Sequence, residues 1–192
     1  MNIVDARGLE CPKPVMKTKE AVEKGCRELS VWIDNEIAAA NVKRYLEGQG
    51  FAVKREDGDS TILLEARITA ENKNEHKTTA GTYGILFTSD TIGNESDGLG
   101  EVLMKSYLGT LVKKEFPPVT VGLMNQAVKM ALKESSAYDY FSELSDKGTL
   151  ILVCGTCTKH FGVTDKVGIG VISNMFEITE AVFGTAKPIV IG

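Results

Sequence analysis

The sequence is poor in several residue types, and each shortage narrows what it can do. Its 192 residues include 2 histidines, 1 tryptophan and 4 cysteines, and 22 basic side chains stand against 26 acidic ones, a formal charge of −4. Without an excess of positive charge to neutralise phosphates, nucleic acid is not expected as a partner. No apolar run approaches the roughly 20 residues that span a bilayer, and no signal-peptide pattern opens the chain. We therefore expect a cytoplasmic protein without membrane contact.

The shortage of metal ligands and of glycine motifs bears on cofactors. A reducing cytoplasm disfavours structural disulfides, so the cysteines are expected to be core residues, metal ligands or reactive thiols. The sequence Gly168-Ile-Gly170 lacks the third glycine of a dinucleotide fingerprint and follows no early strand. No Walker loop or Ser/His/Asp set is recognisable. We expect no bound cofactor.

One segment separates two parts of different pattern. Residues 70–81 contain no large apolar side chain and show no periodicity, which is typical of a linker. We expect a first domain at residues 1–67, a linker at 68–81 and a second domain at 82–192. Both domains have a workable size.

The first part alternates short apolar runs with helical spacing. Strands are expected at 3–4, 29–33, 51–55 and 61–65, with helices from near Cys11 to Gly25 and from Asp34-Asn35 to Gly48. Asp57-Gly58 is a hairpin signal between the last two strands. The pattern predicts a two-layer βαβαββ sandwich, with helices on one face of a sheet.

The second part alternates strands and helices as parallel sheets require. Apolar runs predict strands at 84–88, 119–123, 149–153 and 188–191, and a weaker one at 167–171. Helical spacing is found at 99–111, 128–132, 138–144 and 175–182, the last preceded by a capping Asn174. We expect a parallel-sheet, three-layer α/β domain.

Cys11 lies in the sequence Arg7-Gly-Leu-Glu-Cys-Pro-Lys-Pro14, where a strand gives way to a helix. Prolines fit a first helical turn, because the amides that they lack would have no partner there. A thiolate beside Arg7, Lys13 and the positive end of a helix is expected to have a lowered pKa. That chemistry suits sulfur transfer; a buried, inert cysteine is the alternative.

This stretch, with the following helix, strand and Asp34-Asn35, resembles the TusA/SirA-like family of sulfur-carrier proteins, marked by Cys-Pro-x-Pro. The resemblance covers Met1 to about Ala66. It implies that Cys11 carries a persulfide sulfur received from a cysteine desulfurase and passed to another thiol. Pro12 and Pro14 are then scaffold, and Lys13 occupies a position that is often acidic in the family.

Cys154-Gly-Thr-Cys157 directly follows the strand at 149–153. A parallel sheet would deliver both thiols to the edge where such folds hold ligands. A dithiol redox or sulfur-handling pair, a zinc site and a tight turn are the alternatives. Zinc would need His160 and a distant cysteine to complete its ligands, since there is no second CxxC, so no metal is predicted.

The second part resembles the DsrE-like sulfur-relay proteins, in Ser89-Asp-Thr-Ile-Gly93, in the CxxC and in Ser173-Asn-Met-Phe-Glu-Ile178. The order of the two motifs resembles the YedF-type proteins of selenium metabolism. This resemblance implies a sulfurtransferase-like relay of sulfur or selenium, selenium-metabolism partners and a homo-oligomer. A thiol-disulfide oxidoreductase and a redox-sensing regulator are the other functions that we consider.

The remaining polar candidates have weaker signals. Cys26 is expected to be a bystander. His160 could shuttle protons near Cys157, although a solvated histidine is the more common outcome. Asp90 and Asn125 follow the first two strands of the second sheet and could share the edge of Cys154, but turn capping is the better interpretation.

Overall fold

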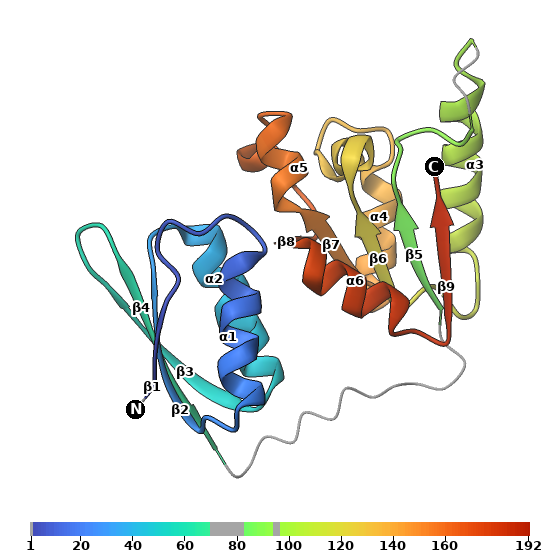
Figure 1. Ribbon diagram of the computed structural model, residues 1–192. Coiled ribbons are helices and arrows are strands. Elements are labelled where there is room, and N and C mark those ends of the chain that lie inside the picture. Colours follow the sequence, from blue (N-terminus) through green and yellow to red (C-terminus); the bar gives the residue numbers. More distant parts are fainter. Residues whose placement is uncertain (1, 70–82, 94–96) are drawn as a thin grey trace. The chain divides into compact units, whose positions relative to one another are not determined.

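The computed structural model describes residues 2–69, 83–93 and 97–192. These residues form two compact units, one within positions 1–77 and the other within 78–192 (Figure 1). The predicted linker at 68–81 lies outside the described residues, apart from its first two positions. Of these, Ile68 is the last residue of a strand.

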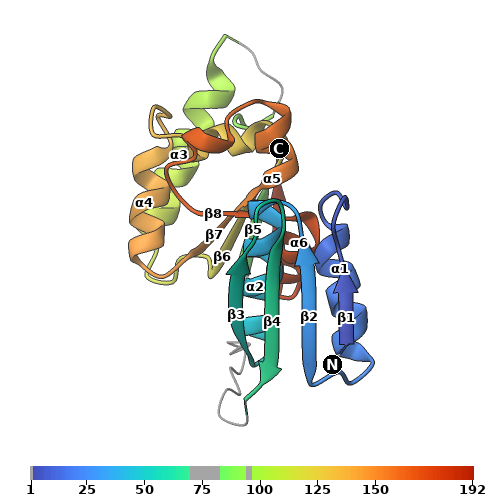
Figure 2. The same ribbon diagram turned by 90° about the vertical axis from the view of Figure 1, so that its left-hand side faces the viewer.

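The first unit is a four-stranded sheet with two helices. Its elements are β1 (Asn2–Asp5), α1 (Lys13–Glu23), β2 (Glu28–Ile33), α2 (Glu36–Gly48), β3 (Phe51–Asp57) and β4 (Ile62–Ile68). The strand order is β1-β2-β4-β3, with β1 parallel to β2 and the other pairs antiparallel. Both helices cover the same face of the sheet, as Figures 1 and 2 show. The predicted two-layer sandwich is confirmed.

The core of this unit lies between the sheet and the two helices. Val31 and Leu64 from the strands and Val42 and Leu46 from α2 are fully buried there. The start of α2 is fixed by Asn35, whose Oδ1 accepts the backbone N–H of Ala38 at 2.8 Å. The apolar side chains on one face of the strands and on one face of the helix therefore pack together in a single layer.

The second unit is a parallel sheet of five described strands in the order β8-β7-β6-β5-β9. Its elements are β5 (Tyr83–Phe87), α3 (Leu99–Val112), β6 (Thr120–Leu123), the 3₁₀ helix η1 (Asn125–Ala131), α4 (Tyr138–Asp146), β7 (Leu150–Cys154), α5 (Gly155–His160), the 3₁₀ turn η2 (Thr164–Lys166), β8 (Val171–Ser173), α6 (Met175–Phe183) and β9 (Lys187–Ile191).

Helices cover both faces of this sheet. On one face, Phe87 packs edge-on against Tyr107 of α3 and Phe141 of α4, with ring centroids 6.2 and 6.1 Å apart. On the other face, a side chain at Gly122 would lie 2.7 Å from Ile178 of α6. Figure 1 shows α6 on the side of the sheet opposite α4. The predicted three-layer α/β arrangement is confirmed.

Two predicted elements of this unit are wrong in place or type. The fifth strand was expected at 167–171, but β8 begins only at Val171, because Gly170 adopts a φ of 84° that breaks the extended chain. Val167 makes an isolated bridge to Leu132 instead. Most of the segment predicted as helical at 128–132 belongs to the 3₁₀ helix η1, which ends at Ala131.

The spacing of Leu99, Leu103, Tyr107 and Leu111 predicts that these residues form the buried face of α3, and this is only partly right. Leu99 and Leu103 are 55% and 42% exposed, whereas Met104, Leu108 and Leu111 are buried. Apolar residues surround most of this helix, so its spacing does not decide which stripe faces the sheet. Tertiary packing makes that choice.

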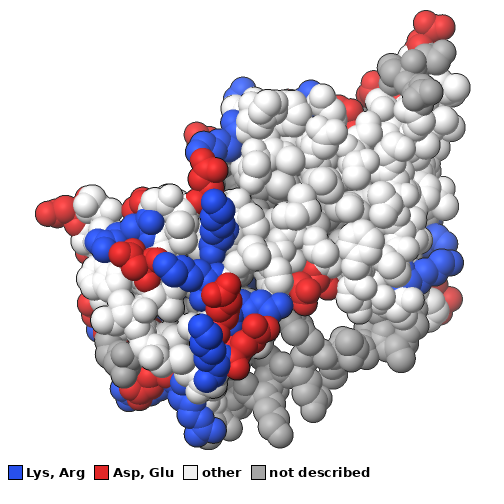
Figure 3. Space-filling model, in the orientation of Figure 1, with Lys and Arg blue, Asp and Glu red and all other residues white. Residues whose placement is uncertain are grey.

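Charge is distributed differently over the two units. Figure 3 shows Lys, Arg, Asp and Glu side chains interspersed on the visible face of the first unit, and few of them over much of the second. Within the described ranges, no helix is both long enough and apolar enough to cross a membrane.

Candidate functional site

Cys11 lies at the junction of β1 and α1, directly before Pro12, the N-cap residue of α1. The carbonyl of Pro12 accepts the N–H of Met16 at 3.2 Å, so the helix begins immediately after the cysteine. Pro14 is buried in the first turn, while Cys11 is half-buried. The thiol is therefore accessible and stands at the positive end of the helix dipole.

Arg7 is not the free cation that the sequence suggests. Its Nε and Nη2 donate to the two carboxylate oxygens of Asp5 at 2.9 and 2.7 Å, and its guanidinium lies 5.9 Å from the centre of the Trp32 ring. The hydrogen bonds from Arg7 hold the pKa of the Asp5 carboxyl well below its usual range. Asp5 thus compensates the charge of Arg7, so that Arg7 offers Cys11 less positive charge than the sequence suggests. Lys13 is exposed to solvent.

The loop that carries Cys11 is tied to the start of α2. Gly8 has a φ of 68°, which favours glycine, and its N–H donates to Asp34 Oδ2 at 2.6 Å. Asp34 was expected to share the capping of α2, but Asn35 makes the cap and Asp34 holds the loop. The β1–α1 turn is therefore fixed by a contact 26 positions away in the sequence.

The second thiol pair stands at the carboxyl end of β7. Cys154 is the last residue of the strand and the N-cap of α5, and Cys157 lies in the first turn of that helix. The helix α5 ends at His160, and the chain turns at Phe161 and Gly162. Both cysteines and Cys11 are thiols in this structure.

The two thiols of the pair have different surroundings. Cys154 is 2% exposed, and burial raises the pKa of its thiol to about 11. Cys157 is half-buried, and its Sγ accepts the backbone N–H of Asn125 at 3.1 Å. Asn125 has a φ of 51°, an uncommon conformation outside glycine. Cys157 is therefore the accessible thiol and Cys154 the neutral, shielded one.

Three adjacent strands bring polar groups to this edge of the sheet. Strand β7 lies between β6 and β8, so Asn125 follows one neighbour and Asn174 follows the other. The register places Ser173 opposite Cys154. Asn174 Nδ2 and Gln126 Oε1 are buried and have no hydrogen-bond partner. Asn174 was predicted only as a helix cap, and the Asn125 contact uses a backbone amide, which any residue type supplies.

The other candidates lie elsewhere. Asp90 lines a hollow of about 420 Å³ together with Glu101 and Lys129, without a cysteine. His160 is exposed and packs edge-on against Phe161, with centroids 5.0 Å apart. Cys26 accepts a hydrogen bond from Asn2 Nδ2. Among the residues that the structure describes, no three His, Cys, Asp or Glu side chains are grouped to hold a metal ion.

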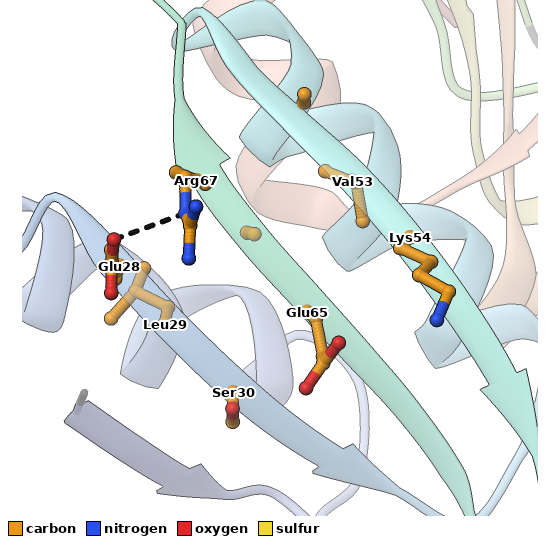
Figure 4. Close-up of a pocket in the computed structure, with 9 residues that line it drawn as sticks. Glu28, Leu29, Ser30, Val53, Lys54, Glu65 and Arg67 are labelled. Carbon is orange, nitrogen blue, oxygen red and sulfur yellow. Dashed lines mark ion pairs between the residues drawn. The ribbon is translucent and has the colours of Figure 1, made fainter.

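The face of the first sheet that the helices leave open carries a groove of about 330 Å³ (Figure 4). Ser30, Glu65 and Lys54 line it, and an ion pair of 3.0 Å joins Arg67 to Glu28 at one end. Cys11 is not among its lining residues. The groove and the thiol are separate features of this unit.

The first unit is similar to known sulfur-handling proteins. Residues 2–67 match the model of the TusA family, described as Sulfurtransferase TusA. A candidate sulfur carrier protein of Methanocaldococcus jannaschii is 42% identical over 55 residues, which are 28% of this chain and 73% of that protein.

Two solved structures are also similar to parts of the chain. A SirA-like protein from Desulfitobacterium hafniense is 31% identical, with 35% of this chain and 96% of that one covered and a TM-score of 0.33. A protein of unknown function from Methanobacterium thermoautotrophicum is 18% identical, with 56% and 98% covered and a TM-score of 0.39. On the match over residues 2–67 and the identity to the archaeal protein, the chain belongs to the TusA family.

Proposed function

We propose that this protein carries and transfers sulfur or selenium, with Cys11 holding the atom as a persulfide-type adduct. The observation that carries the proposal is the accessible thiol of Cys11 at the start of α1, within the residues that match the TusA family. We further propose that the second unit is a DsrE-like domain, so that the chain is a YedF-type fusion. We also propose that the protein can act in selenium metabolism and that it assembles as a homo-oligomer.

Loading of Cys11 requires a donor that itself holds a persulfide, such as a cysteine desulfurase. The Cys11 thiolate attacks the terminal sulfur of the donor persulfide, a new S–S bond forms, and the donor cysteine leaves as its thiolate. The product is a persulfide on Cys11, with no net oxidation or reduction. The helix dipole at the start of α1 favours the thiolate that this step needs.

The geometry of the CxxC pair supports Cys157 as the next acceptor. Cys157 is half-buried and accepts an N–H, whereas Cys154 is buried and its thiol pKa is raised to about 11. Attack by the Cys157 thiolate on the terminal atom of the Cys11 adduct would move that atom to Cys157 and release Cys11 as a thiolate. This order of roles differs from that in a thioredoxin-like dithiol, in which the first cysteine of the motif attacks and the second resolves.

Cys154 is then suited to release. Its thiol, on losing its proton, attacks Cys157 Sγ, the Cys154–Cys157 disulfide forms, and the terminal atom leaves as hydrosulfide or hydroselenide. The transferred atom gains two electrons and the dithiol loses two, so a reducing dithiol must restore the pair. A thiol-disulfide oxidoreductase, the alternative function, would use the same Cys154–Cys157 pair without Cys11.

The test is mass spectrometry of the full chain after incubation with a cysteine desulfurase, cysteine or selenocysteine, and an alkylating trap. We expect one added sulfur or selenium on Cys11, lost in Cys11→Ser and kept in the matched Cys26→Ser. We also expect a second adduct on Cys157. An unloaded Cys11, with only a Cys154–Cys157 disulfide formed, would favour the oxidoreductase instead.

A further inference from the structure

The oxygen and the nitrogen of the Asn174 side-chain amide differ in their hydrogen bonding. Its Oδ1 accepts the backbone N–H of Glu177 at 3.0 Å and so caps α6. Its Nδ2 is buried and has no hydrogen-bond partner, and the whole residue is only 1% exposed. Because the cap fixes one end of the amide, the orientation of the N–H donors is fixed as well.

A buried donor without a partner is uncommon and unfavourable. More than nine in ten buried polar groups in proteins are hydrogen-bonded, and an orphan costs its full desolvation penalty. Capping alone does not explain why this position has an asparagine, since serine or aspartate caps a helix equally well without an N–H donor. The unused amide therefore indicates a ligand that arrives during function.

The position of Asn174 identifies that ligand. Ser173 is paired with Cys154 across β7 and β8, so Asn174 follows directly at the edge that holds the thiol pair. On the other side of β7, the N–H of Asn125 already meets Cys157 Sγ at 3.1 Å. Each of the two strands beside β7 is thus followed by a residue with an N–H donor at this edge of the sheet. Neither Cys157 nor Cys154 is bonded to Asn174 Nδ2 in the thiol form.

We infer that Asn174 Nδ2 binds the terminal chalcogen anion of a persulfide or perselenide held on Cys157. The adduct extends Cys157 by one atom, which carries a negative charge and needs a donor that the bare thiol does not use. Hydrogen bonds to charged groups are the stronger ones. This inference rests on the proposed function, since it requires an adduct on Cys157.

The test uses the full chain with Cys11→Ser, Cys26→Ser and Cys154→Ser, so that an adduct accumulates on Cys157. Inorganic polysulfide is the loading probe, and alkylation of the persulfide by iodoacetamide is followed by mass spectrometry across a pH series. In Asn174→Ser the helix cap is kept, and the amide Nδ2–H donor is replaced by a hydroxyl on a shorter side chain. We expect the pH of half-maximal alkylation to rise by about one unit, so that alkylation at lower pH slows about tenfold.

Two matched variants separate this role from a structural one. Asn35→Ser makes the same change at the cap of α2, in the other unit. Gln126→Ala removes a second amide side chain, whose buried unpartnered atom is the acceptor Oε1 rather than an N–H donor. Both should leave the alkylation profile of the parent unchanged.

The outcomes are distinguishable. If the adduct forms and Asn174→Ser has the profile of the parent, or if either control shifts it equally, the role of Asn174 is refuted while the relay stands. If the parent takes up no sulfur on Cys157 although Cys11 of the native chain is loaded, Asn174 and the acceptor role of Cys157 are both refuted. If Cys11 also fails to load, the proposed function itself is refuted.

Discussion

The unequal burial of the CxxC thiols predicts a large difference in their reactivity. Burial raises the pKa of Cys154 from 9.0 to about 11. Two units correspond to about a hundredfold less thiolate at any pH well below both values, and about one molecule in 10⁴ at pH 7. Since the thiolate is the nucleophile, Cys154 should alkylate at least about a hundredfold more slowly than an ordinary exposed cysteine. Its 2% exposure can only slow it further.

The assay is a time course with iodoacetamide on the reduced native chain, with peptide mass spectrometry resolving each cysteine. Cys157, half-buried but accessible, should be modified well before Cys154. Full modification of Cys154 should require denaturant or a pH near 11, and a denatured sample run in parallel gives the reference rate. Equal rates for the two thiols in the native chain at neutral pH would refute the assignment of the shielded and accessible roles.

Three further predictions concern stability, each measured by urea unfolding. Gly122→Ala should lower the free energy of unfolding by about 1 to 3 kcal/mol, because its methyl would lie 2.7 Å from Ile178. Gly109→Ala is the control, since its methyl would make only an ordinary contact at 3.6 Å. Equal losses of stability in the two variants would contradict this packing. The raised pKa of Cys154 contributes stability that is present below about pH 9 and lost as pH rises through about 11. Cys154→Ala should therefore remove up to about 3 kcal/mol of the fall in unfolding free energy over that pH range. An unchanged dependence of the unfolding free energy on pH would argue against a buried thiol. Asn35→Ala should cost about 1 kcal/mol through the lost cap of α2, and no loss would refute the cap.

Much of the fold was predictable because both kinds of periodicity agree with the tertiary structure. The first unit has its predicted strands, helices and hairpin, since strand alternation and the Asn35 cap leave one arrangement that buries a single apolar layer. In the second unit the strands with the clearest apolar runs were also found. The errors fell where local pattern is ambiguous, as in α3, which is apolar on most sides, and around Gly170, where one positive φ decides where a strand begins.

The sequence indicates which residues could form the candidate site, but it does not predict their geometry. Spacing pointed to Cys11 and to the CxxC, but it could not say which thiol of the pair is buried, because that depends on how far β7 extends before α5 begins. The pairing of Arg7 with Asp5, two positions apart, could have been read from the sequence. The Asn125 amide could not, because a backbone group leaves no signature in residue type.

The place of Cys154 in the core has a consequence for survival under oxidative stress. Peroxide converts exposed thiolates to sulfenic, sulfinic and sulfonic acids, and the last two steps are largely irreversible. Cys154 packs within the apolar cluster of the second unit and stays protonated at neutral pH, so it should react with oxidant far more slowly than Cys157. An oxidised Cys157 would meet an intact thiol one helical turn away, and the resulting disulfide is a form that cellular reductants can repair. Cys154 would thus protect Cys157 from irreversible oxidation by forming a reducible disulfide with it.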